Sequence, residues 1–111
     1  MLENSGVVWV SAAQVRELGL QNALVPHLER LRQEVEQVYV HLDLDVLDPT
    51  EAHANSYLAP EGLTVAEVKK AIEAVKAKFS IAAGCLASFE PDCDTDNRAL
   101  NAALELLAAL I

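Results

Sequence analysis

The apolar positions of the chain follow two different periods. Three short runs are rich in β-branched, aromatic and aliphatic residues, which is the composition of buried strands. They lie at residues 7–10 (VVWV), about 37–44 and 80–89. Elsewhere apolar residues recur every three or four positions, which predicts amphipathic helices. These helices are expected at 11–18, 22–36, 64–78 and 96–109.

Helix-terminus signals support these boundaries. Ser11 with Gln14, and Thr64 with Glu67, have the spacing of a capping box, in which each side chain satisfies a backbone N–H of the other residue. Gly19 is expected to end the first helix, because glycine adopts the left-handed conformation of a helix C-terminus without strain.

Two helices carry features that bear on their packing. Pro26 is tolerable in the helix at 22–36 only within its first turn, because proline has no N–H to donate. Both this helix and the last one have an apolar stripe along one face. The stripes consist of Leu24, Leu28, Leu31 and Val35, and of Leu100, Leu104, Leu107 and Ile111.

The order of elements is strand, two helices, strand, helix, strand, helix. Strands that alternate with helices predict the α/β class, with a parallel sheet of about three strands and flanking helices. The 111 residues suffice for a single domain, residues 1–111. Three parallel strands are few, since such sheets are normally covered on both faces and their free edges favour pairing. We therefore expect either an oligomer or a part of a larger fold.

Composition and charge exclude several classes of partner. The net charge is −9 and the isoelectric point is near 4.6, so neither nucleic acid nor an anionic membrane is an expected partner. No apolar run has the length of a membrane span, and no basic-then-apolar leader opens the chain. We expect a cytoplasmic protein.

The six aspartates fall into two clusters, and the first follows the central strand. Asp43 and Asp45 are two residues apart, so on a strand they point to the same side, at the end where open α/β sheets bind ligands. Two such carboxylates suit a divalent cation such as Mg²⁺ or Mn²⁺, which could lower the pKa of a bound water. The alternative is a pair of aspartates that cap turns and face water. Asp48 with Pro49 fits a turn better than a ligand role.

The second cluster, at Asp92, Asp94 and Asp96, has a superficial likeness to a calcium loop. The glycine position of such a loop is taken by Asn97 and the position of its bidentate acid by Ala103, so a calcium site is not expected. The cluster fits a helix N-terminus better, with Asp94 or Asp96 as the cap.

Three other side chains lie near the predicted sheet edge. His41 shares the side of Asp43 and is either a ligand, a proton carrier or a structural histidine. Ser88 ends the third strand, without a His–Asp pair to make it a nucleophile. His53 lies in the long connection at 46–63, where a solvated histidine is expected.

Residues 41–49, HLDLDVLDP, resemble the S-F-D-x-D-x-x-D-P motif of the arginase–agmatinase (ureohydrolase) family. EGLT at 61–64, followed by Glu67, is similar to the family's G-G-L-T-x-x-E. Residues 7–19 and 86–107 resemble other strand and helix segments of the family. The resemblance implies the C-terminal third of a ureohydrolase, and thus a fragment of the three-layer α/β/α arginase fold.

The resemblance also implies a chemistry. In the family the two aspartates of this motif, here Asp43 and Asp45, bind a binuclear Mn²⁺ centre whose bridging hydroxide attacks a guanidinium carbon and releases urea. The substrate would be a small guanidino compound or linear amidine. His41 stands where the family has serine, and Ser88 where it has the glutamate that holds the guanidinium. Glu90 lies nearby, so all three are candidate neighbours of the substrate site.

The family's D-x-H-x-D motif does not occur in this sequence. Since two carboxylates cannot hold a binuclear centre, the chain alone is expected to be inactive and to need an N-terminal portion or a homo-oligomer. Two alternatives remain open. One is a non-enzymatic, truncated arginase-like remnant that self-associates, and the other is a simple acidic module that binds a divalent cation.

Overall fold

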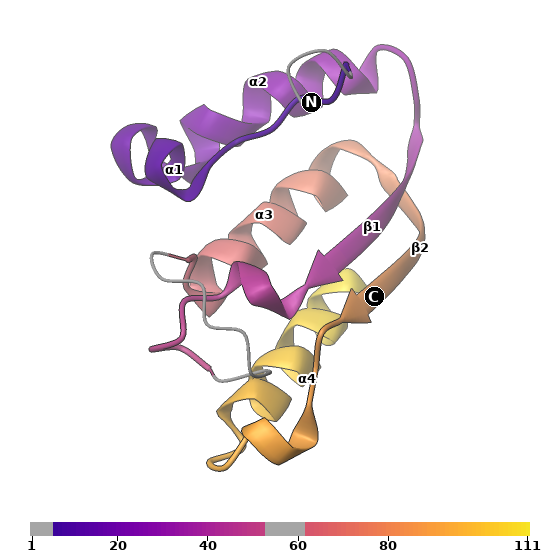
Figure 1. The fold of residues 1–111 in the computed structure, drawn as a ribbon. Helices are drawn as coiled ribbons and strands as arrows, with labels where there is room; N and C mark the ends of the chain where they lie inside the picture. The colour runs from indigo at the N-terminus through magenta and orange to yellow at the C-terminus, as the bar shows by residue number, and fades with distance from the viewer. Residues whose placement is uncertain (1–5, 53–61) are drawn as a thin grey trace.

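The computed structural model describes residues 6–52 and 62–111. A two-stranded sheet lies against helices that follow or connect its strands (Figure 1). The elements are α1 (Ala12–Leu18), α2 (Leu20–Arg32), β1 (Gln37–Asp43), α3 (Val65–Lys78), β2 (Ser80–Ala87) and α4 (Arg98–Leu110). Two short 3-10 turns, η2 (Leu44–Val46) and η3 (Pro91–Cys93), follow the strands.

The sheet has the predicted parallel topology but fewer strands than expected. β1 and β2 are parallel neighbours joined through α3, with His41 opposite Cys85 and Asp43 opposite Ala87. The pairing slips by one residue between Val38 and Tyr39. The α/β class with flanking helices is therefore confirmed, whereas the sheet of the described residues has two strands instead of about three.

The strand expected at residues 7–10 is not a strand in the structure. The stretch has no regular secondary structure and runs along α2, apart from the sheet (Figure 1). Val7, Val8 and Trp9 are 55%, 56% and 55% exposed. Strand formation needs a neighbour that can pair with the backbone, and β1 and β2 pair only with each other in the described part of the chain. The apolar, β-branched sequence favours an extended backbone, but it does not supply the neighbouring strand.

The helix termini follow the sequence signals closely. The Ser11 hydroxyl accepts from the backbone N–H of Gln14 at 3.1 Å, and the Gln14 side chain accepts from the backbone of Ser11 at 2.8 Å. In the same way, the Thr64 hydroxyl accepts from the backbone N–H of Glu67 at 3.1 Å, and the Glu67 side chain accepts from the backbone N–H of Thr64 at 2.9 Å. Gly19, at φ +82°, separates α1 from α2. Both predicted capping boxes and the glycine stop are confirmed.

Pro26 departs from its expected place. Because α2 begins directly after Gly19, Pro26 lies in the helix interior and not in the first turn. It cannot donate to the carbonyl of Asn22, four residues earlier. The helix forms despite this defect because it packs on α3, and tertiary contacts supply most of a helix's stability in a protein.

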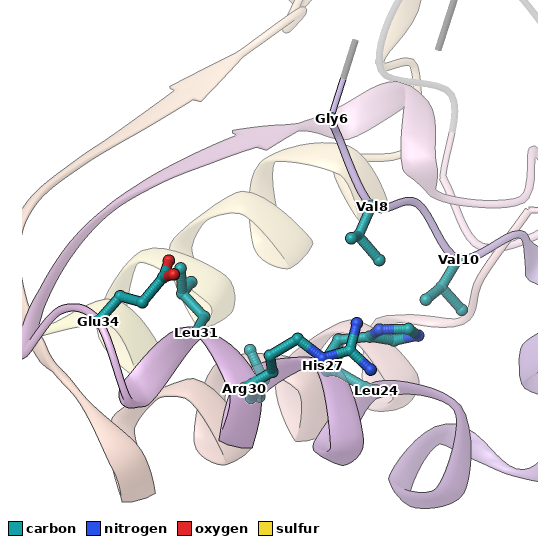
Figure 2. A pocket seen from close by; sticks show the side chains of 9 residues that line it. Gly6, Val8, Val10, Leu24, His27, Arg30, Leu31 and Glu34 are labelled. Carbon is teal, nitrogen blue, oxygen red and sulfur yellow. The ribbon is translucent and has the colours of Figure 1, made fainter. Parts of the chain in front are cut away.

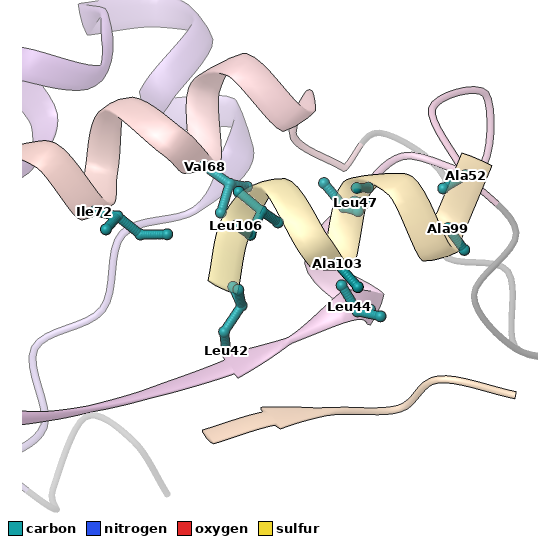
Figure 3. Packing of buried hydrophobic residues seen from close by; sticks show 10 residues of the cluster. Leu42, Leu44, Leu47, Ala52, Val68, Ile72, Ala99, Ala103 and Leu106 are labelled. Carbon is teal, nitrogen blue, oxygen red and sulfur yellow. The ribbon is translucent and has the colours of Figure 1, made fainter. Parts of the chain in front are cut away.

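The core lies where α3 and α4 cover the end of β1. Leu44 and Leu106 are its two largest fully buried side chains. Leu42, Leu47, Val68, Ile72, Ala99 and Ala103 pack around them (Figure 3). This places the end of β1 in the best-packed region of the molecule.

α4 turns an unexpected face to this core. Its predicted stripe of four residues does share one face, but the side chains are exposed: Leu100, Leu104, Leu107 and Ile111. The buried face is built instead from Ala99, Ala102, Ala103 and Leu106. Three of these four residues are small alanines, and the fourth, Leu106, is fully buried. Across the described residues, no helix has both the length and the apolarity that a membrane crossing requires.

Candidate metal centre

Asp43 marks the point where β1 ends. Its backbone is still extended, at φ −98° and ψ 124°, and its Oδ1 accepts a hydrogen bond of 2.9 Å from the backbone N–H of Asp45. An aspartate that accepts from the N–H two residues on folds the chain into a turn. The expectation that Asp43 and Asp45 share one side of a strand is therefore wrong: Asp45 lies in η2.

The two carboxylates are nevertheless held by the core. Both are half-buried, and they flank Leu44, which is 1% exposed. Leu42, just before Asp43, is also buried. Since Asp43 lies opposite Ala87 in the parallel register, the pair sits at the carboxyl edge of the sheet, where open α/β sheets place their ligand sites.

The chemistry of the pair fits part of a divalent-cation site. Carboxylate oxygens are preferred ligands of Mg²⁺ and suit Mn²⁺. However, residues 6–52 and 62–111 contain no group of three or more His, Cys, Asp or Glu side chains placed to hold a metal ion. Asp43 and Asp45 can supply two ligands, and the others must come from outside the described residues.

His41 does not complete such a group. It is exposed and lies opposite Cys85 on the sheet, and it forms no three-membered ligand cluster with Asp43 and Asp45. His41 and Asp43 are both in β1 and share one face of it, as their sequence parity predicts, but Asp45 lies beyond the strand in η2. A direct ligand role for His41 has no support in this geometry. His53 lies outside the described residues.

Asp48 has the turn role that its sequence indicates. Its Oδ1 accepts from the backbone N–H of Thr50 at 2.9 Å and from the Thr50 hydroxyl at 2.7 Å. Leu63 binds this turn through two backbone hydrogen bonds. The N–H of Asp48 donates to the carbonyl of Leu63 at 3.0 Å, and the N–H of Leu63 donates to the carbonyl of Val46 at 2.8 Å.

This pairing depends on Gly62, whose role the sequence reasoning missed. A Cβ atom at Gly62 would lie 2.6 Å from the backbone nitrogen of Asp48 and 2.7 Å from the carbonyl oxygen of Val46. Only glycine fits such a close approach of two backbones. The signal available in the sequence was Gly62 itself, two residues before the Thr64 cap and within the segment that resembles a family motif.

The second acidic cluster caps α4, as predicted. Asp94 is 7% exposed, and its two carboxylate oxygens accept from the N–H groups of Ala99 and Leu100, each at 2.9 Å. Asp96 is exposed and accepts from Arg98, whose hydrogen bonds hold the pKa of the Asp96 carboxyl below its usual value. Of the pair, Asp94 supplies the capping hydrogen bonds, whereas the N-cap position itself is Asn97, whose side chain makes no capping hydrogen bond.

Ser88 and Glu90 follow the end of β2. Ser88 has a left-handed backbone, at φ 72°, so the chain bends sharply there. Glu90 is exposed, and one of its carboxylate oxygens accepts from the Cys93 thiol, with 3.7 Å between the two atoms. Partial burial, followed by the nearby Glu90 and Asp92 charges, raises the pKa of the Cys93 thiol. Glu90 is thus directed into the η3 turn.

A family model for the arginase family matches residues 1–111. The chain belongs to the arginase family. The predicted resemblance is therefore confirmed over the whole sequence. No protein of curated function matches the chain in sequence.

Solved arginase-family structures share its fold. The arginase from Bacillus caldovelox is 25% identical, with a TM-score of 0.88 over 98% of this chain and 36% of that protein. The proclavaminate amidino hydrolase from Streptomyces clavuligerus is 30% identical, with a TM-score of 0.79 over 95% of this chain and 34% of that one. The formimidoylglutamase from Bacillus subtilis, at 22% identity and a TM-score of 0.82, shares the fold.

The arginase-family chain spans about a third of the length of these neighbours. It therefore matches a part of the arginase fold. At the sheet edge, the described residues add no third His, Cys, Asp or Glu side chain to Asp43 and Asp45 that would make a group able to hold a metal ion.

Proposed function

We propose that this arginase-family chain supplies two ligands, Asp43 and Asp45, to the Mn²⁺ site of a hydrolase that cleaves C–N bonds of guanidino compounds or linear amidines. The observation that carries the proposal is a pair of half-buried carboxylates at the carboxyl edge of a parallel sheet, in a chain of this family. The substrate class is supported by two structural neighbours, an arginase and a proclavaminate amidino hydrolase.

A divalent cation bound at such a site would lower the pKa of a water molecule, and so make a nucleophile available near neutral pH. The chain's own residues would orient the ligands. Asp43 keeps one oxygen on the N–H of Asp45, which restricts the rotation of its carboxylate. Buried Leu42 and Leu44 hold the backbone on both sides of it.

Ser88 and Glu90 are proposed as neighbours of the substrate. Ser88 directly follows Ala87, the last residue of β2, which lies opposite Asp43, so it lies at the same edge of the sheet as the carboxylates. Its hydroxyl could accept a hydrogen bond from a guanidinium group. Glu90 would have to release its contact with Cys93 to take part.

We expect the chain alone to have no hydrolytic activity, because the described residues gather no third metal ligand. Two carboxylates can still hold one cation weakly. Activity would require the remaining ligands from another polypeptide or from a further portion of the same protein.

Calorimetric titration of the purified chain with Mn²⁺ tests the ligand assignment. We expect binding that weakens by about tenfold or more in the Asp43→Ala/Asp45→Ala variant, because the variant lacks both oxygen ligands. The matched control is Asp92→Ala/Asp96→Ala, which removes the same charge from exposed aspartates elsewhere. Its affinity should equal that of the unchanged chain, and circular dichroism should show that both variants are folded.

Equal weakening in the two double variants would mean that only net charge attracts the cation, and would contradict the assignment. So would binding that survives Asp43→Asn but is lost in Asp94→Asn, the pattern of an acidic module centred on the second cluster. The two Asp94 oxygens already accept two backbone hydrogen bonds, which argues against that module. A urea-release assay on guanidino substrates should show no turnover by the chain alone.

A further inference from the structure

The backbone that follows Asp45 pairs with a segment that comes later in the chain. Leu47 and Leu63 form a parallel bridge. The N–H of Leu63 donates to the carbonyl of Val46 at 2.8 Å, and the N–H of Asp48 donates to the carbonyl of Leu63 at 3.0 Å. Since Val46 directly follows Asp45, this bridge fixes the backbone on the far side of the acidic pair.

The bridge is anchored in the core. Leu47 is 3% exposed, and Leu63 packs against the same buried cluster. Leu44, between the two aspartates, is 1% exposed. Asp45 thus lies between two buried leucines, and the bridge begins at the second. A shift of Asp45 relative to Asp43 would have to displace one of these side chains from a closely packed interior.

The later segment is tied to the start of α3. Thr64, next to Leu63, forms the capping box with Glu67. The N–H of Val65 donates to a carboxylate oxygen of Glu51 at 2.8 Å. These hydrogen bonds join the bridge to a helix that packs on both α2 and α4. The position of the bridge is therefore set by the helical layer as well as by the turn.

Gly62 determines how closely the two segments approach. A Cβ atom at this position would lie 2.6 Å from the backbone nitrogen of Asp48 and 2.7 Å from the carbonyl oxygen of Val46. These are the groups whose hydrogen bonds to Leu63 make the bridge. Any residue larger than glycine would push the two segments apart.

Arg16 holds the same glycine from α1. One of its guanidinium N–H groups donates to the carbonyl of Gly62, and another donates to the carbonyl of Ala12 at 3.3 Å. The helix that carries Arg16 is itself supported, because Val15 is 6% exposed and α1 packs on α2. Figure 2 shows Val10, just ahead of α1, pointing toward the side chains of α2. Arg16 therefore links a supported helix to the edge of the sheet where the acidic pair lies.

We propose that Gly62 and Arg16 are positioning residues for the Asp43–Asp45 pair. Gly62 admits the bridge, and Arg16 holds the Gly62 carbonyl. The bridge in turn keeps the Asp43 carboxylate on the N–H of Asp45. A cation binds two carboxylates better when their separation is already set, because ordering them on binding lowers the affinity. The part of this inference that concerns Mn²⁺ rests on the proposed function, whereas the part that concerns the turn does not.

Amide hydrogen exchange of the chain without metal, measured by NMR, tests the effect on the turn. In Gly62→Ala, the N–H of Asp45 should exchange about tenfold faster, because the added methyl breaks the adjoining hydrogen bonds of the bridge. The N–H of Phe79, which donates to Val75 at 2.9 Å at the other end of α3, is the internal reference and should change less than about twofold. Equal acceleration at both sites would mean a general loss of stability and would overturn the proposal.

Gly84→Ala is the matched control. The same methyl there would lie 3.4 Å from the carbonyl oxygen of Val40 and 3.6 Å from the Leu110 side chain, which are ordinary contacts. Exchange of the Asp45 N–H should therefore stay within about twofold of its rate in the unchanged chain. The proposal is overturned if Gly84→Ala has the same effect as Gly62→Ala, or if Gly62→Ala has none.

Two variants of Arg16 keep the test decisive if circular dichroism shows that Gly62→Ala does not fold. Arg16 is exposed, so both variants should fold. Arg16→Met removes the donors but keeps a long side chain, and it should accelerate exchange of the Asp45 N–H about two- to threefold, because exposed charged groups contribute modestly. Arg16→Lys retains a charged donor and should return the rate toward that of the unchanged chain. An unchanged rate in Arg16→Met would contradict the proposal.

Calorimetric titration with Mn²⁺ separates this proposal from the proposed function. Gly62→Ala should weaken binding about threefold or more, whereas Gly84→Ala should not. If the unchanged chain binds no Mn²⁺ while the exchange results hold, the ligand assignment fails and the positioning of the turn stands. If Mn²⁺ binds through Asp43 and Asp45 with equal affinity in both glycine variants, the assignment stands and the positioning role is overturned.

Discussion

At the scale of single residues, similar aspartate spacings serve different purposes in this protein. Asp43 and Asp45 lie two apart and are linked by a hydrogen bond from the backbone of one to the side chain of the other. Asp94 and Asp96 have the same spacing, yet one is a buried helix cap and the other an exposed partner of Arg98. The role of each carboxylate depends on which backbone N–H groups donate to it.

The Asp94 cap should contribute measurably to stability. Asp94→Ala leaves the N–H groups of Ala99 and Leu100 without their acceptor in a buried position. We expect the free energy of unfolding to fall by about 1–2 kcal/mol, the usual contribution of a helix N-cap. Urea denaturation followed by circular dichroism measures it. Asp92→Ala, at an exposed position of the same turn, is the control, and an equal loss there would show that Asp94 is not the cap.

The Cys93 thiol should react slowly near neutral pH. Its pKa is raised by partial burial and by the Glu90 and Asp92 charges, so less of it is thiolate at a given pH. Glu90→Gln removes one negative charge and should lower the pKa, which increases the thiolate fraction. In a Cys85→Ala background, we expect the rate of reaction with a disulfide reagent at pH 8 to rise a few-fold.

The rate profile against pH distinguishes this effect from a change in access. If Glu90 acts through charge, the profile of the Glu90→Gln variant should shift to lower pH and reach the same plateau at high pH. A uniform increase at every pH would show that the substitution had merely opened the η3 turn.

At the scale of elements, helices agree with their sequence signals better than strands do. Both capping boxes form, and Gly19 ends α1 as predicted. The stretch at 7–10 has strand composition but no strand structure. The difference arises because a helix satisfies its hydrogen bonds within the segment, whereas a strand needs a neighbour.

Pro26 is the weak point of α2. Replacing it with alanine restores the N–H that can bond to the carbonyl of Asn22, and removes the clash of the ring with the preceding turn. We expect Pro26→Ala to raise the free energy of unfolding, by up to about 3 kcal/mol. Thermal or urea unfolding measures the gain. Pro49→Ala, in the turn after Asp48, should not be stabilising, and a loss of stability in Pro26→Ala would show that the proline has a packing role.

At the scale of the whole molecule, the apolar side chains of the described residues are only partly buried. α3 and α4 bury a core against the end of β1, yet apolar side chains remain exposed on residues 7–9, on the α2 stripe and on α4. These patches lie on separate elements, so one two-fold contact between copies would cover only some of them.

The sequence by itself determined what depends on nearby residues. The helix caps, the Asp48 turn and the Asp94 cap rest on hydrogen bonds between positions a few residues apart, and the parallel order of β1 and β2 follows from the helix between them. The D-x-D motif and its surroundings also sufficed to indicate the arginase family, which the match over residues 1–111 confirms.

Only the tertiary structure decided what depends on distant parts of the chain. It moved Asp45 from the strand into η2, where the neighbouring Leu44 is buried in the core with residues of α3 and α4. It required glycine at position 62, where two backbones meet. It left residues 7–10 without a strand and turned Leu100, Leu104 and Leu107 outward. Pairing and burial depend on what lies across from a segment, and periodicity along the chain does not contain that information.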